Sequence, residues 1–248
     1  MFDQFKSAVL SFDAASGLTP ELENQLLLGR DGAISCLYAP FEHVAANARV
    51  VFVGITPGRS QAELSLGAMK HALEAGCSDE EALRQAKLTA SFSGTAMRNN
   101  MTAMLDRIGL HHRLGIAGSA ELFEADGLAH FTSALRFPVL FEGENYNGRG
   151  ADLLKSPFLR RMIDTWLAEE ARQLSQALWL PLGKEPARAV AHLVARGILP
   201  ADRVISGLPH PGTANNGRVA EFLGDARKRY ALIRDQLTRR LETLSIEA

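Results

Sequence analysis

The chain has 248 residues, of which 46% are hydrophobic and 22% charged, and this composition excludes a disordered or fibrous protein. With 27 basic and 28 acidic residues the net charge is −1, which argues against a protein that coats nucleic acid non-specifically. No apolar run reaches the roughly 18 residues of a membrane span, and no secretory signal is recognisable. The two cysteines fit a reducing compartment and cannot alone hold a zinc ion or an iron–sulfur cluster. We therefore expect a cytoplasmic protein without a membrane partner, a metal or another cofactor.

The first half of the chain contains clear start signals for helices and one for a buried strand. Thr19 followed by Pro20 predicts a helix start, since a hydroxyl caps the first turn and proline fits its geometry; Gly29 is a plausible end. The apolar, β-branched run over residues 50–53 predicts a buried strand that ends at Gly54. Ser78-Asp79-Glu80-Glu81 is a capping box, which predicts a helix to about residue 88, and another helix is expected over 95–108.

The second half continues the alternation of strands and helices. Strands are expected over 129–135, 177–182 and 203–206, and helices after Ser156-Pro157, over 185–196 and over 218–244. Strands separated by helices predict a three-layer α/β/α fold around a central, mostly parallel four-stranded sheet. Because no repeat or linker is recognisable, we predict a single domain over residues 1–248, with a helical insertion at 60–90.

Ligands bind beyond the carboxyl ends of the strands in such sheets, so the loops there are the candidate sites. The loop Gly54-Ile55-Thr56-Pro57-Gly58-Arg59 has two glycines around a proline, a tight turn that a ligand can approach closely. It is not a phosphate-binding P-loop, because Lys-Ser/Thr does not follow its second glycine. Taken alone, the loop is equally well explained as a structural turn.

A second loop and an aromatic residue complete the set of candidates. His210 stands between two prolines, and stiff backbone on both sides suits a group that must not move. A surface or capping histidine is the alternative. Phe92, just before the helix expected at 95–108, would by itself be explained as a core residue.

In combination, these motifs resemble those of the uracil-DNA glycosylases, in particular the iron–sulfur class of bacteria and archaea. The resemblance covers about Ala48 to Arg240 and rests on six short motifs in the same order: Gly54-Ile55-Thr56-Pro57-Gly58, Phe92-Ser93-Gly94, Leu105-Asp106-Arg107-Ile108-Gly109-Leu110, Thr132-Ser133-Ala134-Leu135-Arg136, Pro181-Leu182-Gly183 and His210-Pro211-Gly212. Enzymes of this superfamily flip a uracil out of DNA and hydrolyse its N-glycosidic bond, leaving an abasic site, with no metal at the reaction centre.

The resemblance implies two catalytic residues. His210 would donate to the uracil oxygen that gains charge, and Thr56 stands where relatives position the attacking water. Phe92 would stack on the base, and the other substrate-binding residues would be Gly54, Ile55, Pro57, Gly58, Ser133, Asn145 and Asn147. The predicted contacts with DNA are Arg59, Arg136, Arg149, Pro211, Gly212, Asn215 and Arg218. The expected partner is single- or double-stranded DNA that contains uracil, bound by a monomer.

The chain also departs from the pattern of the family. Thr56 replaces an Asp or Asn and is far too weak a base to deprotonate water, so Glu63, Glu142 or Glu144 could act instead. Ser133 replaces the base-reading Asn, and Asn145 or Asn147 either substitutes for it or belongs to a simple turn. The cluster cysteines are missing. Two other functions stay open: a catalytically weak or inactive nucleobase- or DNA-binding relative, and a small-molecule nucleoside-processing enzyme on the same fold.

Overall fold

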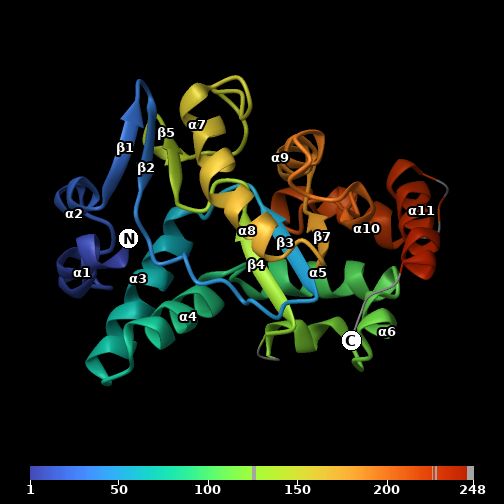
Figure 1. Ribbon diagram of the computed structural model, residues 1–248, viewed down its shortest axis with the longest axis horizontal. Helices are drawn as coiled ribbons and strands as arrows, with labels where there is room; N and C mark the ends of the chain where they lie inside the picture. Colours follow the sequence, from blue (N-terminus) through green and yellow to red (C-terminus); the bar gives the residue numbers. More distant parts are fainter. Residues whose placement is uncertain (125–126, 225, 227, 245–248) are drawn as a thin grey trace. The chain divides into compact units, whose positions relative to one another are not determined.

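A computed structural model describes residues 1–124, 127–224, 226 and 228–244 of the chain (Figure 1). The chain forms two compact units, each assembled from three separate segments. The first unit consists of Met1–Val44, Ile55–Ser91 and Leu135–Leu167, and the second of Ala45–Gly54, Phe92–Ala134 and Ala168–Ala248. The backbone therefore passes from one unit to the other five times.

The second unit is built on a parallel sheet. Its strands are β3 (Val50–Gly54), β4 (Ala129–Ser133) and β7 (Leu178–Pro181), in the order β4-β3-β7. All residues of β3 and β7 are buried, as expected of strands covered on both faces. The sheet packs with helices of this unit into one apolar cluster that includes Phe52, Phe131 and Phe222. The chain is thus an α/β protein.

Helices make up most of the rest of the second unit. They are α5 (Thr95–Arg107), α6 (Leu110–Leu114), α8 (Ala168–Gln173), α9 (Lys184–Ala195), α10 (Asn216–Leu223) and α11 (Arg229–Thr243), with short 3-10 turns η1 (Ser119–Phe123), η3 (Ala201–Arg203) and η4 (Thr213–Asn215) (Figure 1). The predicted helices over 95–108 and 185–196 correspond to α5 and α9 and are confirmed.

The fourth strand predicted over 203–206 is reduced to an isolated parallel bridge. Val204 pairs with Trp179, and the Ile205 N–H donates to the Trp179 carbonyl at 2.8 Å. Gly207 then takes a φ of +130°, and two prolines follow, so the backbone leaves the sheet after a single pairing. Within the described residues, the parallel sheet has three strands and not four.

The first unit contains a sheet that the sequence did not reveal. It is antiparallel, and its strands β1 (Leu27–Asp31), β2 (Ile34–Leu37), β5 (Val139–Phe141) and β6 (Glu144–Asn145) lie in the order β1-β2-β5-β6. The prediction of a helix end at Gly29 was wrong. Gly29 lies inside β1, where a side chain would meet the Phe158 ring at 3.2 Å.

The helices of the first unit include three whose starts the capping residues predicted, after Thr19, Ser78 and Ser156. The helices of this unit are α1 (Phe2–Ser11), α2 (Pro20–Gln25), α3 (Arg59–Glu74), α4 (Asp79–Ala90) and α7 (Pro157–Met162), followed by a π-helical turn, η2 (Ile163–Leu167). The hydroxyls of Thr19, Ser78 and Ser156 accept from the backbone N–H three residues further on, at 3.2–3.3 Å. Residues 60–90 are mostly helical, in α3 and α4.

The long helix predicted over 218–244 was wrong, because α10 and α11 are separate helices. The prediction includes residues 225 and 227, which lie outside the described residues. The Arg234 guanidinium donates to the carbonyls of Phe222 at 3.2 Å and Gly224 at 2.7 Å, so a cation caps the end of α10. Across the described part of the chain, no helix has both the length and the apolarity needed to cross a bilayer.

Candidate functional site

The carboxyl edge of the parallel sheet in the second unit brings Gly54, Phe92 and Ser133 together. Gly54 ends β3, and Ser133 ends the neighbouring β4. A Cβ at position 54 would lie 3.3 Å from the Ser133 hydroxyl oxygen and 3.4 Å from the Phe92 ring. A glycine suits this close approach, because a side chain at position 54 would press on the Ser133 hydroxyl and contact the Phe92 ring.

Phe92 has an unusual backbone conformation. Its φ is +45°, in the left-handed region that bulky residues rarely occupy. Its ring packs on Phe131 with centroids 5.8 Å apart, and the residue is 6% exposed. Packing thus holds Phe92 in a strained conformation, a feature that is concentrated at ligand sites.

His210 lies on the loop that follows the bridge at Val204 and is fixed by two glycines. Gly183, which follows β7, has a φ of +99°, and a Cβ there would lie 3.2 Å from the His210 Cβ. The Gly212 N–H donates to His210 Nδ1 at 3.0 Å. Because Nδ1 accepts, the neutral ring carries its proton on Nε2.

The charge state of His210 follows from its surroundings. Burial lowers the pKa of this imidazole, because the charged form loses its hydration. Protonation of Nδ1 would also cost the hydrogen bond from Gly212. His210 is therefore a neutral, oriented Nε2–H donor near pH 7.

Helix α5 holds the loop that carries His210. The Asn100 side chain donates to the Pro211 carbonyl at 2.9 Å and to Asn216 Oδ1 at 3.0 Å. Further along, Arg218 donates to Asn215 Oδ1 at 3.0 Å. No sequence pattern pointed to Asn100, because its partners lie more than a hundred residues away in the chain.

In the first unit, Thr56 anchors the loop after β3. Its hydroxyl donates to the Phe137 carbonyl at 2.9 Å and accepts from the Val139 N–H at 3.0 Å. The preceding Ile55 carbonyl accepts from the Leu135 N–H at 2.9 Å. The single hydroxyl proton of Thr56 is thus already used by the backbone next to β5.

Asn145 supports the same loop at Gly58 and Arg59. Its Oδ1 accepts from the Arg59 N–H at 2.9 Å, and a Cβ at Gly58 would lie 3.1 Å from its amide. The Arg59 side chain pairs with Glu23 and donates to the Gly143 carbonyl at 3.2 Å. Of the two open explanations for Asn147, the simple turn describes its contact, since its Oδ1 accepts from the Arg149 N–H at 3.2 Å.

The predicted contacts with DNA differ in their exposure. Arg136 is only 7% exposed, and its guanidinium donates to the Trp166 carbonyl at 3.0 Å, which is a structural contact, so its contact with a DNA phosphate stays a prediction. Pro211 is also buried, whereas Arg149 and Arg218 are exposed.

The carboxylates suggested as alternatives to Thr56 do not share one environment. Glu63 Oε1 accepts from the Leu18 N–H at 3.1 Å, while Glu142 and Glu144 are exposed. A carboxylate that the sequence did not indicate is Glu42. Its pKa is raised by burial, although the Tyr38 hydroxyl, 3.0 Å from both oxygens, acts in the opposite direction.

These contacts define an α/β protein with a candidate site at the carboxyl edge of its parallel sheet. Among residues 1–124 and 127–244, where described, no three His, Cys, Asp or Glu side chains gather as metal ligands would. The chain is 31% identical over 204 residues to the "Uncharacterized protein YoxB" of Bacillus subtilis (strain 168), covering 81% of this chain and 79% of YoxB. The chain therefore belongs to the same family as YoxB. No family model and no solved structure matches it.

Proposed function

We propose that this protein is a DNA glycosylase that hydrolyses the N-glycosidic bond of a uracil flipped out of DNA and leaves an abasic site. The observation that carries the proposal is the state of His210, a neutral Nε2–H donor held by Gly183 and Gly212. When the glycosidic bond breaks, its electron pair passes to the departing uracil. A fixed donor aimed at the uracil oxygen stabilises that charge without reorganising.

The neighbours of Gly54 support the proposal. Phe92 would stack on the extruded base, and the Ser133 hydroxyl would bind its polar edge. The bridge at Val204 extends the parallel sheet by one further segment, and we propose that this is the fourth strand of a uracil-DNA glycosylase-like α/β/α fold. Exposed Arg149 and Arg218 are the proposed phosphate contacts.

The proposed reaction depends mainly on the departure of uracil. The hydroxyl proton of Thr56 is already donated to a backbone carbonyl, so this residue can orient a water molecule only by accepting from it. Water then adds to the sugar carbon and releases a proton to solvent. The proposal includes a cytoplasmic location, a monomeric state and chemistry without a cofactor, as the sequence suggests.

A nucleobase- or DNA-binding protein with weak hydrolysis is the second candidate. The Thr56 hydroxyl is engaged with Phe137 and Val139, and this favours a structural role over the activation of water. Phe92 is 6% exposed and would have to be uncovered before a base could stack on it. Both features are compatible with binding in which hydrolysis is slow.

A single-turnover assay separates the two candidates. Single- and double-stranded oligonucleotides with one uracil are incubated with the protein, and alkali-labile sites are counted; the matching thymine oligonucleotides are the control. We expect cleavage at uracil only, and His210→Ala should lower the rate about 100-fold or more, the scale of one lost stabilising donor. The matched control is His112→Ala, an exposed histidine of the same unit, which should keep the rate.

The outcomes assign the function. Binding of the uracil oligonucleotide without cleavage between about pH 6 and pH 9 would favour the second candidate, because acid–base groups titrate across that range. If the protein neither bound nor cleaved the uracil oligonucleotide, both candidates would be excluded. Thr56→Asn adds a gain-of-function test, since a faster variant would support the match of position 56 with the family motif.

A further inference from the structure

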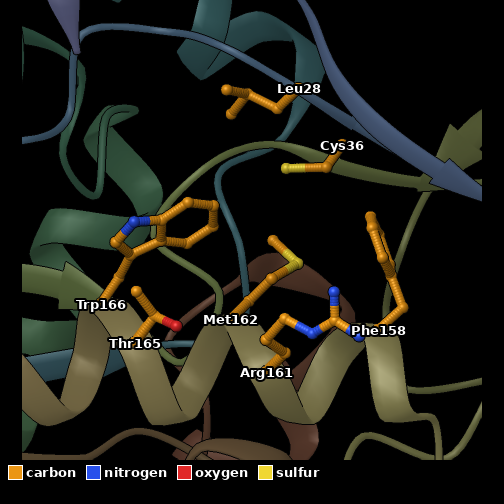
Figure 2. A pocket seen from close by; sticks show the side chains of 7 residues that line it. All are labelled: Leu28, Cys36, Phe158, Arg161, Met162, Thr165 and Trp166. Atoms are coloured by element: carbon orange, nitrogen blue, oxygen red, sulfur yellow. The ribbon is translucent and has the colours of Figure 1, made fainter.

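The first unit contains a cavity of about 200 Å³. Its lining includes none of the residues discussed for catalysis. It lies between the strands β1 and β2 and the helix formed by α7 and η2 (Figure 2). The lining side chains are mostly apolar, and they are Leu28, Cys36, Phe158, Arg161, Met162, Thr165 and Trp166.

Two irregularities of the backbone border this cavity. The pairing of β1 with β2 shifts register between Leu27 and Gly29, which places Leu28 at a bulge. On the other side, η2 is a π-helical turn, and it carries both Thr165 and Trp166. Bulges and π-turns re-aim side chains and are frequent at functional sites, so two of them at one small cavity indicate a ligand site.

Two aromatic side chains form opposite walls, and each is held in place. Figure 2 shows Trp166 on one side of the space and Phe158 on the other. The Phe158 ring rests against Gly29, and the Trp166 ring meets Phe137 edge-on with centroids 4.7 Å apart. The walls are therefore preorganised, which lowers the entropic cost of binding a flat ring between them.

The remaining walls give the cavity its chemistry. Figure 2 shows the Cys36 sulfur and the Met162 side chain pointing into the space from opposite sides. Burial raises the pKa of the Cys36 thiol to about 12, so the thiol stays neutral and acts as an apolar wall. Arg161 is exposed and is the one charged side chain among the lining residues.

We propose that this cavity binds a small, monocyclic aromatic carboxylate, with its ring between Phe158 and Trp166 and its carboxylate at Arg161. A cavity of about 150 Å³ holds benzene, so this larger space fits one ring with a short acidic substituent. A guanidinium matches the planar carboxylate in shape as well as in charge. This site is separate from the proposed glycosylase function and does not depend on it.

The two tryptophans of the chain make the proposal testable by NMR. Trp166 lines the cavity, while the fully buried Trp179 of the second unit donates its indole N–H to the Leu174 carbonyl at 3.0 Å. Phenylacetate is titrated into the ¹⁵N-labelled full chain up to millimolar concentrations, because a ligand of this size binds weakly. We expect the Trp166 indole signal to shift saturably and the Trp179 signal to stay in place.

Variants separate recognition of the ring from recognition of the charge. Arg161→Gln should weaken the binding of phenylacetate about tenfold, the effect of one charge-assisted contact. The same variant should leave the affinity for the neutral analogue 2-phenylethanol unchanged. Arg160→Gln, an exposed neighbour outside the cavity, is the matched control and should change neither ligand. Leu28→Phe should fill the space and abolish binding of both. An unmoved Trp166 signal in the wild type, or equal weakening by both arginine variants, would overturn the proposal.

Discussion

At the scale of single residues, Gly183 connects the end of β7 to the proposed donor. Its φ of +99° and ψ of −178° fall in a region essentially reserved for glycine. Gly183→Ala should therefore lower the free energy of unfolding by about 1–3 kcal/mol, and should displace His210. Gly197→Ala is the control. Gly197 also has a positive φ, +68°, beyond the other end of α9, but a Cβ added there would meet no other atom within 4 Å. Urea unfolding should show a larger loss of unfolding free energy for Gly183→Ala than for Gly197→Ala. Equal losses would contradict the close approach of Gly183 to His210.

His210 should make stability depend on pH. Burial lowers its pKa below the ordinary value of 6.5, so below that pH the unfolded chain takes up a proton that the folded chain resists. The contribution to stability is complete above the unfolded pKa and is lost as the pH falls toward the folded value. His210→Gln should flatten the decrease in urea midpoint between about pH 7.5 and about pH 5.5, whereas exposed His71→Gln should keep it. An unchanged slope in His210→Gln would show that the imidazole is not desolvated.

Thr56 should matter for stability whatever its role in catalysis. Thr56→Val keeps the shape but removes the partner of the Phe137 carbonyl and the Val139 N–H, and should cost about 1–3 kcal/mol in urea unfolding. Thr56→Ser keeps the hydroxyl and is expected to lose much less. If the two variants proved equally stable, the hydroxyl would not be the anchor of this loop.

At the scale of elements, the sequence predicted what local signals encode. The starts of α2, α4 and α7 follow from their capping hydroxyls, and β3 and β7 follow from short apolar runs. The antiparallel sheet escaped prediction because β1 has no alternation of buried and exposed residues and β6 has only two residues, both exposed. Only the pairing of β2 with β5 joins distant segments, which no local pattern indicates, whereas β1 with β2 and β5 with β6 form hairpins of neighbouring segments.

The same distinction applies to the candidate site. The position of Gly54 follows from its place after an apolar strand, and that of His210 from its place after the bridge at Val204, and the sequence pointed to both residues. The packing of Gly183 on His210 and the anchoring of the loop by Asn100 depend on contacts between remote segments. Thr56 is a similar case, since its hydrogen bonds reach residues 137 and 139.

The break between α10 and α11 yields a prediction for this pair of helices. The Arg234 side chain reaches back to the last carbonyls around the end of α10, and it is mostly buried. Arg234→Gln should cost about 2 kcal/mol, the value of hydrogen bonds to a charged group. Arg239→Gln changes the same residue type at an exposed position of α11 and should cost little in the same urea titration. Equal effects would show that the cap does not stabilise the junction.

At the scale of the whole molecule, the chain does not complete one compact unit before it begins the other. Each unit combines three segments, and the backbone crosses between the units five times. If the first unit unfolded alone, the segments of the second would be joined by flexible loops of 37 and 33 residues, 55–91 and 135–167. Closing each such loop costs about 3 kcal/mol, a large part of the stability of a small unit.

We therefore expect the two units to unfold together, and native-state hydrogen exchange can test this in the full chain. The slowest amides of β2 in the first unit and of β3 in the second should give the same opening free energy and the same dependence on urea. Leu237→Ala opens a cavity in the apolar cluster of the second unit. It should lower the opening free energies of β2 and of β3 by the same amount, about 2–5 kcal/mol. The exposed Leu232→Ala on the same helix is the control and should lower neither. If only the opening free energy of β3 fell, the first unit would stay folded on its own. The two units would then unfold independently despite the five crossings of the backbone.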